Sequence, residues 1–322
     1  KDILLIPILP PIEEKTEKNT FIDSKDGVCI LRNIQGKINC NDLDFFKIID
    51  NLKFDLENMK DINMLINTSG NTKFLISENS NINIKNFTYK QTGNYKNSNL
   101  FNIKTSNIQI SSSDFVVEGN NPFETKICEI VNSKLAIENG VIKINNSFST
   151  IGFNVTNSEM TFNKSMIDIS NVMDYIYTFR LLNSKINLNT SVVKNSNTTN
   201  SVTFLLNNST FQGVNNSIFN ENVKEKSFMF WINNYGEIDT VNSLYYFKEN
   251  KQDNKFLFIN NNGFIKPNWL SNAISVGVTL IENLNFKDSE TLLNDFYEKN
   301  IFYDFREDFD LTSKYFFIPQ ND

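Results

Sequence analysis

Apolar and polar residues alternate in short segments along most of the chain. One polar residue separates Ile82 from Ile84, and one separates Ile108 from Ile110. A period of two is typical of a β-strand with one buried face. A helix would instead need apolar residues at spacings of three and four. The pattern therefore predicts many short strands, each of three to five residues before a polar break.

An asparagine recurs at intervals of 25 to 27 residues, and serine follows five of these asparagines as well as the threonine in the one gap. The positions are Asn79, Thr105, Asn132, Asn157, Asn183, Asn208, Asn234 and Asn261. A fixed period of this length indicates a solenoid. Because three short strands and three turns fill one period, each repeat is predicted to form one coil of a parallel β-helix.

Residues at the same position of successive repeats form a column along the solenoid axis, and each column has a predicted place in the coil. One inward column contains Leu75, Phe101, Cys128, Phe153, Phe179, Phe204, Phe230 and Leu257. A second contains Ser77, Ile103, Ile130, Val155, Leu181, Leu206, Ile232 and Ile259. We expect the asparagine column at a corner between strands, because asparagine tolerates the left-handed backbone conformation. Stacked side-chain amides could also hydrogen-bond from coil to coil.

This pattern resembles the right-handed parallel β-helix, or pectin-lyase-like, superfamily over about residues 46–270. The resemblance implies an all-β solenoid of 25 to 27 residues per coil with terminal caps. Members include polysaccharide lyases and hydrolases, phage tailspikes and passenger regions of bacterial surface proteins. The resemblance therefore specifies the shape and not the activity.

Three regions are expected along the chain. Residues 1–45 form an N-terminal lead-in and cap, in which Pro7, Pro10 and Pro11 exclude a stable helix. Residues 46–270 form the parallel β-helix. Residues 271–322 form a C-terminal cap with a short helix after Ser289. Caps are expected because an open solenoid end exposes its core and a strand edge.

Charge and cysteine content narrow the possible partners. The net charge is −6, from 31 basic and 37 acidic residues without a basic stripe, which argues against nucleic acid. No apolar run approaches the length of a transmembrane helix. Cys128 is expected to act as a small buried hydrophobe. Cys29 and Cys40 would either pair in an exported protein or remain two thiols.

The sequence predicts no catalytic residues, cofactor or metal site. It contains no histidine, which excludes Ser-His-Asp and Cys-His arrangements and the commonest zinc ligand. Enzymes of the superfamily that the chain resembles generally gather carboxylates on one outer face. The candidate acids fall in different columns: Asp114, Asp168, Asp174 and Asp239. Asp168 is expected between Lys143 and Lys194, where two cations would favour its ionised form.

One outward column changes from polar to apolar along the chain. It reads Ile76, Asn102, Glu129, Asn154, Arg180, Leu205, Trp231 and Phe258. Exposed aromatic stripes bind sugars or partner proteins. We therefore predict a ligand site made of Trp231, Tyr235, Tyr245, Tyr246 and Phe258. The alternative is that residues 271–322 fold back over this stripe.

We expect an exported bacterial protein at the cell surface or outer envelope, acting as a structural or adhesive module that binds glycans or proteins. Because the chain begins at Lys1, we expect a trimmed form, with a signal peptide or a lipid-anchor cysteine placed upstream. The alternatives are a polysaccharide lyase, hydrolase or tailspike-like depolymerase, and a structural rod within a larger protein. The sequence leaves the ligand and the oligomeric state open.

Overall fold

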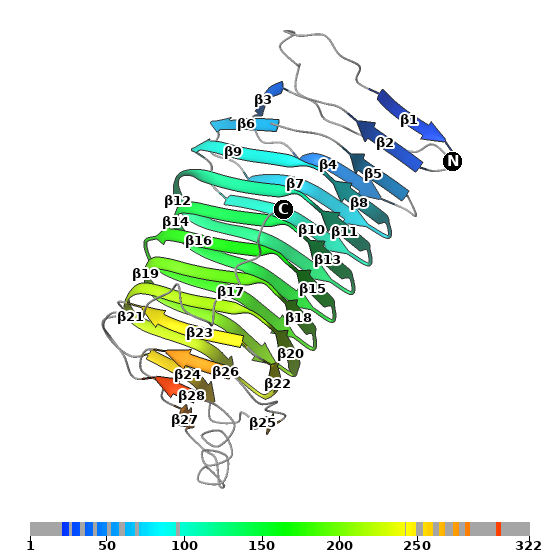
Figure 1. Ribbon diagram of the computed structural model, residues 1–322. Helices are drawn as coiled ribbons and strands as arrows, with labels where there is room; N and C mark the ends of the chain where they lie inside the picture. The colour runs from blue at the N-terminus through cyan, green and yellow to red at the C-terminus, as the bar shows by residue number, and fades with distance from the viewer. Residues whose placement is uncertain are drawn as a thin grey trace.

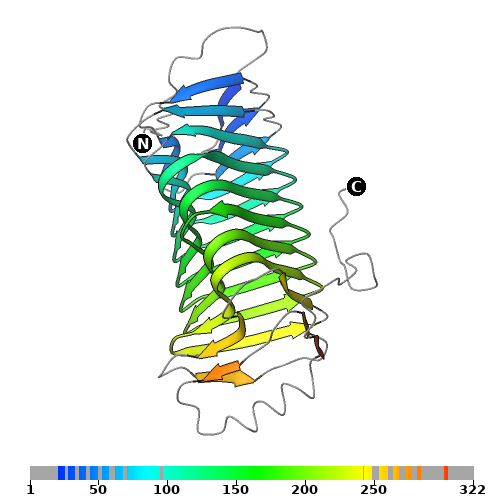
Figure 2. The ribbon, with the colours of Figure 1, turned by 90° about the vertical axis from the view of Figure 1, so that its left-hand side faces the viewer.

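The computed structural model describes most of the central chain and the strands near both ends. The described residues are 21–25, 28–32, 36–40, 44–49, 53–57, 62–67, 71–94, 97–241, 243–248, 254–259, 264–267, 273–276, 281–283 and 301–303. All elements in these ranges are β-strands, stacked in coils along one axis (Figures 1 and 2). The predicted all-β parallel solenoid is confirmed.

The strands form two sheets. The first sheet has eleven strands: β1 (Phe21–Lys25), β2 (Val28–Arg32), β5 (Lys53–Glu57), β8 (Asn81–Lys85), β11 (Asn107–Ser111), β13 (Lys134–Glu138), β15 (Glu159–Asn163), β18 (Lys185–Asn189), β20 (Ser209–Val214), β22 (Tyr235–Val241) and β25 (Phe264–Pro267). Apart from the antiparallel pair β1–β2, these strands pair in parallel.

The second sheet wraps around the rest of each coil. Its seventeen strands are β3 (Gly36–Cys40), β4 (Asp44–Ile49), β6 (Ile62–Asn67), β7 (Asn71–Glu78), β9 (Thr88–Asn94), β10 (Asn97–Lys104), β12 (Asp114–Val131), β14 (Val141–Thr156), β16 (Met166–Val172), β17 (Tyr175–Leu182), β19 (Val192–Asn207), β21 (Ser217–Ile232), β23 (Ser243–Lys248), β24 (Asn254–Ile259), β26 (Ala273–Val276), β27 (Ile281–Asn283) and β28 (Ile301–Tyr303). The long strand β14 pairs first with β16 and then with β17. In several coils, two of the three short strands predicted for each repeat are therefore merged into one long strand.

The two predicted inward columns form the core. Their members from residue 75 to residue 232 are at most 2 % exposed, and strand pairing places each above its counterpart in the next coil. The rings of Phe153, Phe179, Phe204 and Phe230 stack at centroid distances of 5.1, 5.2 and 4.9 Å. This continuous apolar stack holds successive coils in register.

Three corners with left-handed backbone mark each fully described coil, seven residues apart. Asn132, Asn139 and Asn146 have φ values of 50°, 49° and 62°. We call these positions the first, second and third corners. The first is the predicted asparagine column, and its residues from Asn79 to Asn208 have φ between 48° and 51°. The left-handed corner is thus confirmed, and the other two follow the same geometry.

At the first corner, most of the side-chain hydrogen bonds between coils come from serine. The backbone N–H of Ser133 donates to Oγ of Ser158 at 2.9 Å, and Ser106 donates to Ser133 in the same way. Each Oγ also donates to a carbonyl two residues earlier, as in Ser133 to Val131 at 2.7 Å. The serine that follows each corner therefore forms a ladder along the axis. Its members are Ser80, Ser106, Ser133, Ser158, Ser184 and Ser209.

A second ladder follows the second corner. Ser165 donates its N–H to Oγ of Ser191, and Ser191 donates to Oδ1 of Asn216 at 2.9 Å. Gly140 donates to Oγ of Ser165 but carries no hydroxyl itself. This ladder is therefore interrupted at Gly140, where the first ladder is continuous.

Parallel strand pairing occurs on both sides of the predicted range 46–270. It begins with β2 and β5 and continues to β26 and β28. The predicted lead-in over residues 1–20 and the helix after Ser289 lie outside the described residues, as do the side chains of Cys29 and Cys40. Cys128 is a buried free thiol. Within the described ranges, no helix is long and apolar enough to cross a membrane.

Candidate functional site

A hollow of about 600 Å³ lies on the outward face of β17, β19 and β21. We call it the aromatic hollow. Its lining is Ile151, Asp174, Tyr175, Tyr177, Arg180, Asn200, Val202, Leu205, Lys226, Phe228, Trp231 and Asn233. Parallel pairing builds it from outward columns: Tyr177 aligns with Val202 and Phe228, and Arg180 aligns with Leu205 and Trp231.

Two edge-to-face aromatic pairs line this hollow. The rings of Tyr175 and Tyr177 lie 5.2 Å apart at 64°, and those of Phe228 and Trp231 lie 5.9 Å apart at 73°. The guanidinium of Arg180 lies over the Tyr177 ring, 5.8 Å from its centroid. The hollow thus combines ring faces with a cation, the combination that gives small-ligand pockets both contact area and orientation.

Charged side chains at the hollow are not neutralised by neighbours. Lys226 and Arg180 bring positive charge and Asp174 brings negative charge. In the described part of the chain, none of the three takes part in an ion pair. These groups are available to the hydrogen-bonding groups of a ligand.

Tyr175 is held in place from two coils away. Its hydroxyl donates to Oε2 of Glu124 at 2.5 Å, reaching across the coil that carries Ser149. Burial raises the pKa of Tyr175, and the hydrogen bond to Glu124 raises it further. Its ring therefore forms a fixed wall of the hollow.

The structure separates the residues of the predicted ligand site. Trp231 lines the aromatic hollow, and the predicted vertical stack of Leu205, Trp231 and Phe258 is confirmed by strand register. Tyr235 is half-buried in β22, which belongs to the other sheet. The side chains of Tyr246 and Phe258, and most of the segment 271–322 that could cover the stripe, lie outside the described residues.

Tyr245 does not lie on the surface as the prediction placed it. It is fully buried, and its hydroxyl hydrogen-bonds that of Thr240 at 2.8 Å. Adjacent residues of a strand point to opposite faces, so Tyr245 and Tyr246 cannot both point outward. Burial also raises the pKa of Tyr245 above that of an ordinary tyrosine.

Sequence reasoning missed Tyr175, Tyr177 and Phe228. A signal for them exists, because Tyr175 and Tyr177 have the period-two spacing of one strand face and precede Arg180, which the outward column already contained. Phe228 stands one coil beyond Val202 in the column of Tyr177. Comparing equivalent positions in successive repeats, which identified Trp231, would also identify these three residues.

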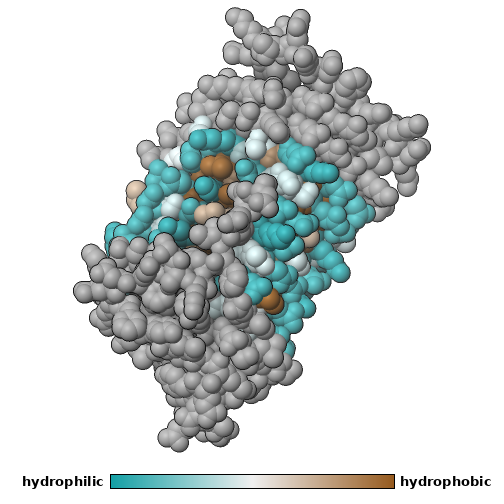
Figure 3. Space-filling model, viewed as in Figure 1, coloured by the Kyte–Doolittle hydropathy of each residue, from teal (hydrophilic) through white to brown (hydrophobic). Residues whose placement is uncertain are grey.

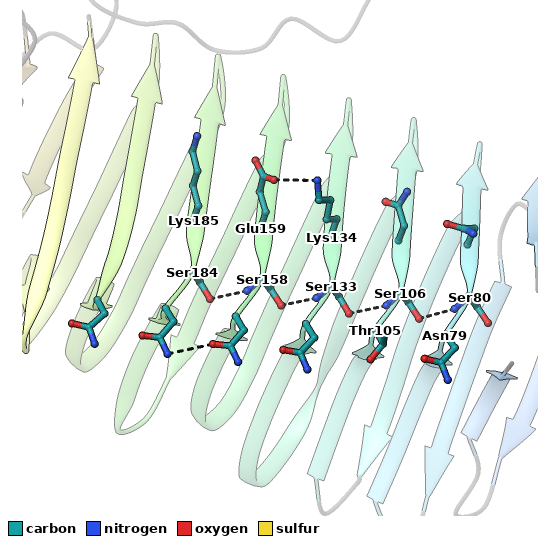
Figure 4. A pocket seen from close by; sticks show the side chains of 16 residues that line it. Asn79, Ser80, Thr105, Ser106, Ser133, Lys134, Ser158, Glu159, Ser184 and Lys185 are labelled. Atoms are coloured by element: carbon teal, nitrogen blue, oxygen red, sulfur yellow. Dashed lines mark hydrogen bonds and ion pairs between the residues drawn. The ribbon is translucent and has the colours of Figure 1, made fainter. Parts of the chain in front are cut away.

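A second candidate surface is a groove of about 1000 Å³ along the first corner, which we call the corner groove (Figure 4). Its lining comprises Asn79, Ser80, Asn81, Thr105, Ser106, Asn107, Asn132, Ser133, Lys134, Asn157, Ser158, Glu159, Asn183, Ser184, Lys185 and Asn208. The ladder serines are buried beneath, while the corner side chains are exposed. The groove therefore presents a regular row of polar side chains along the axis.

The predicted charge ladder of Lys143, Asp168 and Lys194 is present. Strand register aligns the three in successive coils. The expected effect on Asp168 is wrong, however: burial raises its pKa, and this outweighs the lowering by Lys194 and Lys143. Glu221, which pairs with Lys194 at 2.8 Å, raises it too.

The other acids considered from sequence stand apart from one another. Asp114 aligns with Thr88 and Val141, and Asp239 aligns with Gln212 in the other sheet. Burial raises the pKa of each. Among the described residues, no three acidic, cysteine or histidine side chains gather closely enough to hold a metal ion.

Comparison of the chain with protein-family models, with curated proteins and with solved structures gave no match. The structure therefore supports the predicted parallel β-solenoid architecture, and no family is assigned.

Proposed function

We propose that this protein is a non-catalytic glycan-binding module, in which a rigid β-solenoid presents fixed side chains to sugars. The aromatic hollow carries the proposal. Its rings of Tyr177 and Trp231 offer apolar faces, while Arg180, Lys226 and Asn200 offer hydrogen-bonding groups beside them. Sugars have both apolar ring faces and hydroxyl edges, so they match a pocket of this composition.

The rigidity of the site supports binding without a closing motion. The strands beneath it are paired on both sides, and the Tyr175 hydroxyl is fixed by Glu124. A preformed site loses little conformational freedom when a ligand binds. Binding is therefore expected to depend on the hollow as it stands.

The module is further proposed to act at a bacterial cell surface after export, as a pectin-lyase-like β-helix of adhesive type. Support comes from the mostly hydrophilic described face in Figure 3 and from the many exposed polar corners. A solenoid of this kind can repeat weak contacts along its length, which raises the overall strength of attachment.

Retention on immobilised glycans tests the proposal. The purified protein is passed over a panel of neutral and acidic polysaccharides, and new reducing ends and unsaturated products are measured in parallel. Retention without product formation is expected. Turnover of any polymer would contradict a non-catalytic role, and lack of retention on every polymer would contradict glycan binding.

Two variants connect retention to the hollow. Trp231→Ala should lower retention markedly while the melting temperature stays close to that of the wild type. Phe148→Ala removes an aromatic ring that is 43 % exposed and does not line the hollow, so retention should persist. Equal losses in both variants would show that the hollow is not the binding site.

A further inference from the structure

The first and third corners have the same left-handed backbone but use their asparagines differently. At the third corner, Asn171, Asn197 and Asn222 each donate an amide hydrogen bond to an asparagine of the preceding coil, at 2.8, 2.9 and 2.7 Å. The amide groups of these side chains are therefore hydrogen-bonded to asparagines of neighbouring coils. This corner has the amide ladder expected from stacked asparagines.

At the first corner, the amides that line the groove are mostly left open. Across the described coils, one bond joins two of them, from Asn183 to Asn157 at 3.3 Å. Asn79, Asn132 and Asn208 are exposed and make no side-chain hydrogen bond with a described residue. The asparagine amides of the corner groove thus keep hydrogen-bond donors and acceptors free for a ligand, whereas those of the third corner bond to one another.

The serine ladder explains the difference. In the corner groove, Ser133 and Ser158 already provide the bond between coils that an amide ladder would otherwise supply. The adjacent asparagine is needed for its left-handed backbone conformation, and its side chain is exposed to solvent. Neighbouring coils repeat this amide at about 4.8 Å.

The chemistry of the groove favours an uncharged ligand. Lys134 and Glu159 pair with each other at 3.6 Å across neighbouring strands. Among the described lining residues, this leaves Lys185 as the remaining charge. The other lining side chains are amides and hydroxyls, which both donate and accept hydrogen bonds. Among the residues that the structure describes, no aromatic or aliphatic side chain lines it.

Backbone pairing with a peptide is disfavoured at this corner. The N–H groups of Asn79, Thr105, Asn132, Asn157 and Asn183 all donate to carbonyls of the next coil at 2.9 to 3.1 Å. An extended peptide gains affinity by adding to an open strand edge. Over its described length the groove offers no such edge, and its described lining contains no apolar side chain that could form a pocket for a peptide side chain.

From these observations we infer that the corner groove is a second, linear binding site for an extended, uncharged polysaccharide lying along the solenoid axis. The inference adopts glycans as the ligand class from the proposed function. The exposed amides would bind hydroxyls of successive sugars, so affinity depends on how many coils the chain spans. The aromatic hollow, in contrast, is a single local pocket.

Glycine substitutions test the groove without disturbing the backbone. Glycine adopts the left-handed conformation freely, so Asn132→Gly, Asn157→Gly and Asn183→Gly together remove three amides and keep the corners. The probes are linear oligosaccharides of cellulose, xylan and mannan, measured by calorimetry from two to six sugars. In the wild type, affinity should increase with length, and the triple variant should bind the longest probe at least about tenfold more weakly.

A matched control sits at the second corner. Asn86→Gly, Asn139→Gly and Asn215→Gly make the same change at residues with φ of 52°, 49° and 54°, outside the groove. This variant should keep the affinity of the wild type. Equal weakening in both triple variants, or affinity independent of oligosaccharide length, would overturn the inference, as would tighter binding of a serine- and glycine-rich peptide than of any sugar.

The variant at the hollow separates the two sites. If Trp231→Ala abolishes all sugar binding and the groove variant changes nothing, the groove is not a site and the proposed function stands. If the groove variant alone loses long oligosaccharides, the groove is the site and the hollow is not. If the wild type binds no probe and no immobilised glycan, both are wrong.

Discussion

The hydroxyl of Tyr175 is hydrogen-bonded to the carboxylate of Glu124 two coils away, at 2.5 Å. We expect Tyr175→Phe to lower the free energy of unfolding by about 1 kcal/mol or more, because the hydroxyl loses its hydrogen bonds with Glu124 and Ser149. The raised pKa of Tyr175 means that its contribution is complete below the ordinary tyrosine value of 10.0. It is lost as the pH rises through the raised pKa.

Urea unfolding of both proteins from neutral to alkaline pH measures this contribution. Tyr177→Phe is the matched control, since among the described residues no hydrogen bond to the Tyr177 hydroxyl is present. A gap between wild type and Tyr175→Phe that widens at alkaline pH would contradict the assignment.

Ser133→Ala should destabilise the solenoid by about 1 to 3 kcal/mol, because the buried N–H of Ser106 loses its acceptor. Ser170→Ala, at an outward position of β16, should change stability by less than about 0.5 kcal/mol. Thermal and urea unfolding compare the two. If both variants unfold alike, the serine ladder is not what joins the coils at this corner.

Thr190→Asn should stabilise the protein by about 1 kcal/mol, because a β-branched residue is strained in the left-handed region where Thr190 has φ of 49°. Thr210→Asn makes the same exchange within strand β20, where the backbone is extended, and should bring no gain. The shift in melting temperature is the measurement. A gain in the strand variant equal to that at the corner would point away from backbone strain.

Gly152→Ala should cost about 1 to 3 kcal/mol, because a Cβ at this position would overlap the backbone carbonyl oxygen of Thr178 in the next coil. Gly140→Ala should cost less, since its Cβ would mainly meet the Cγ2 methyl group of Ile137 rather than a backbone atom. Calorimetric melting of both variants ranks them. The reverse order would mean that the coil at Gly152 can shift.

Asp168→Asn should stabilise the protein at neutral pH, where the wild-type carboxylate is ionised in a partly buried place. Because its pKa is raised, the favourable contribution of Asp168 is complete below its ordinary value of 3.8 and is lost as the pH rises through the raised value. The two proteins should therefore converge in acid. Urea midpoints across this range check it, and a variant that is less stable at neutral pH would show that Lys143 and Lys194 dominate.

The core and the first corner of each coil can be predicted from the sequence, because the same residue type recurs at each of these positions. Phe153, Phe179 and Phe204 mark the core, and Asn132, Asn157 and Asn183 mark the first corner. The second corner is hidden because its occupants vary. Asn139, Lys164 and Thr190 share only their φ, which neighbouring coils impose through backbone hydrogen bonds.

The candidate sites were less accessible to sequence reasoning. Trp231 was found through its column, but the hollow depends on Tyr175, which Glu124 holds from 51 residues away. Such a contact carries no local signal. The sequence also does not show that the Asn132 amide makes no hydrogen bond to a described residue. Asn171 is the same residue type, and its amide is hydrogen-bonded to Asn145.

Gly140 leaves one interface between coils with one side-chain hydrogen bond fewer than its neighbours. When a β-solenoid is pulled along its axis, the coils bear the load in series, and each interface depends only on its neighbours. Most interfaces near the second corner include a hydroxyl or amide link, but Gly140 offers none to the coil of Ser113. Stretching should therefore separate the coils first at this interface. The products would be two shorter solenoids, each with its coils still stacked.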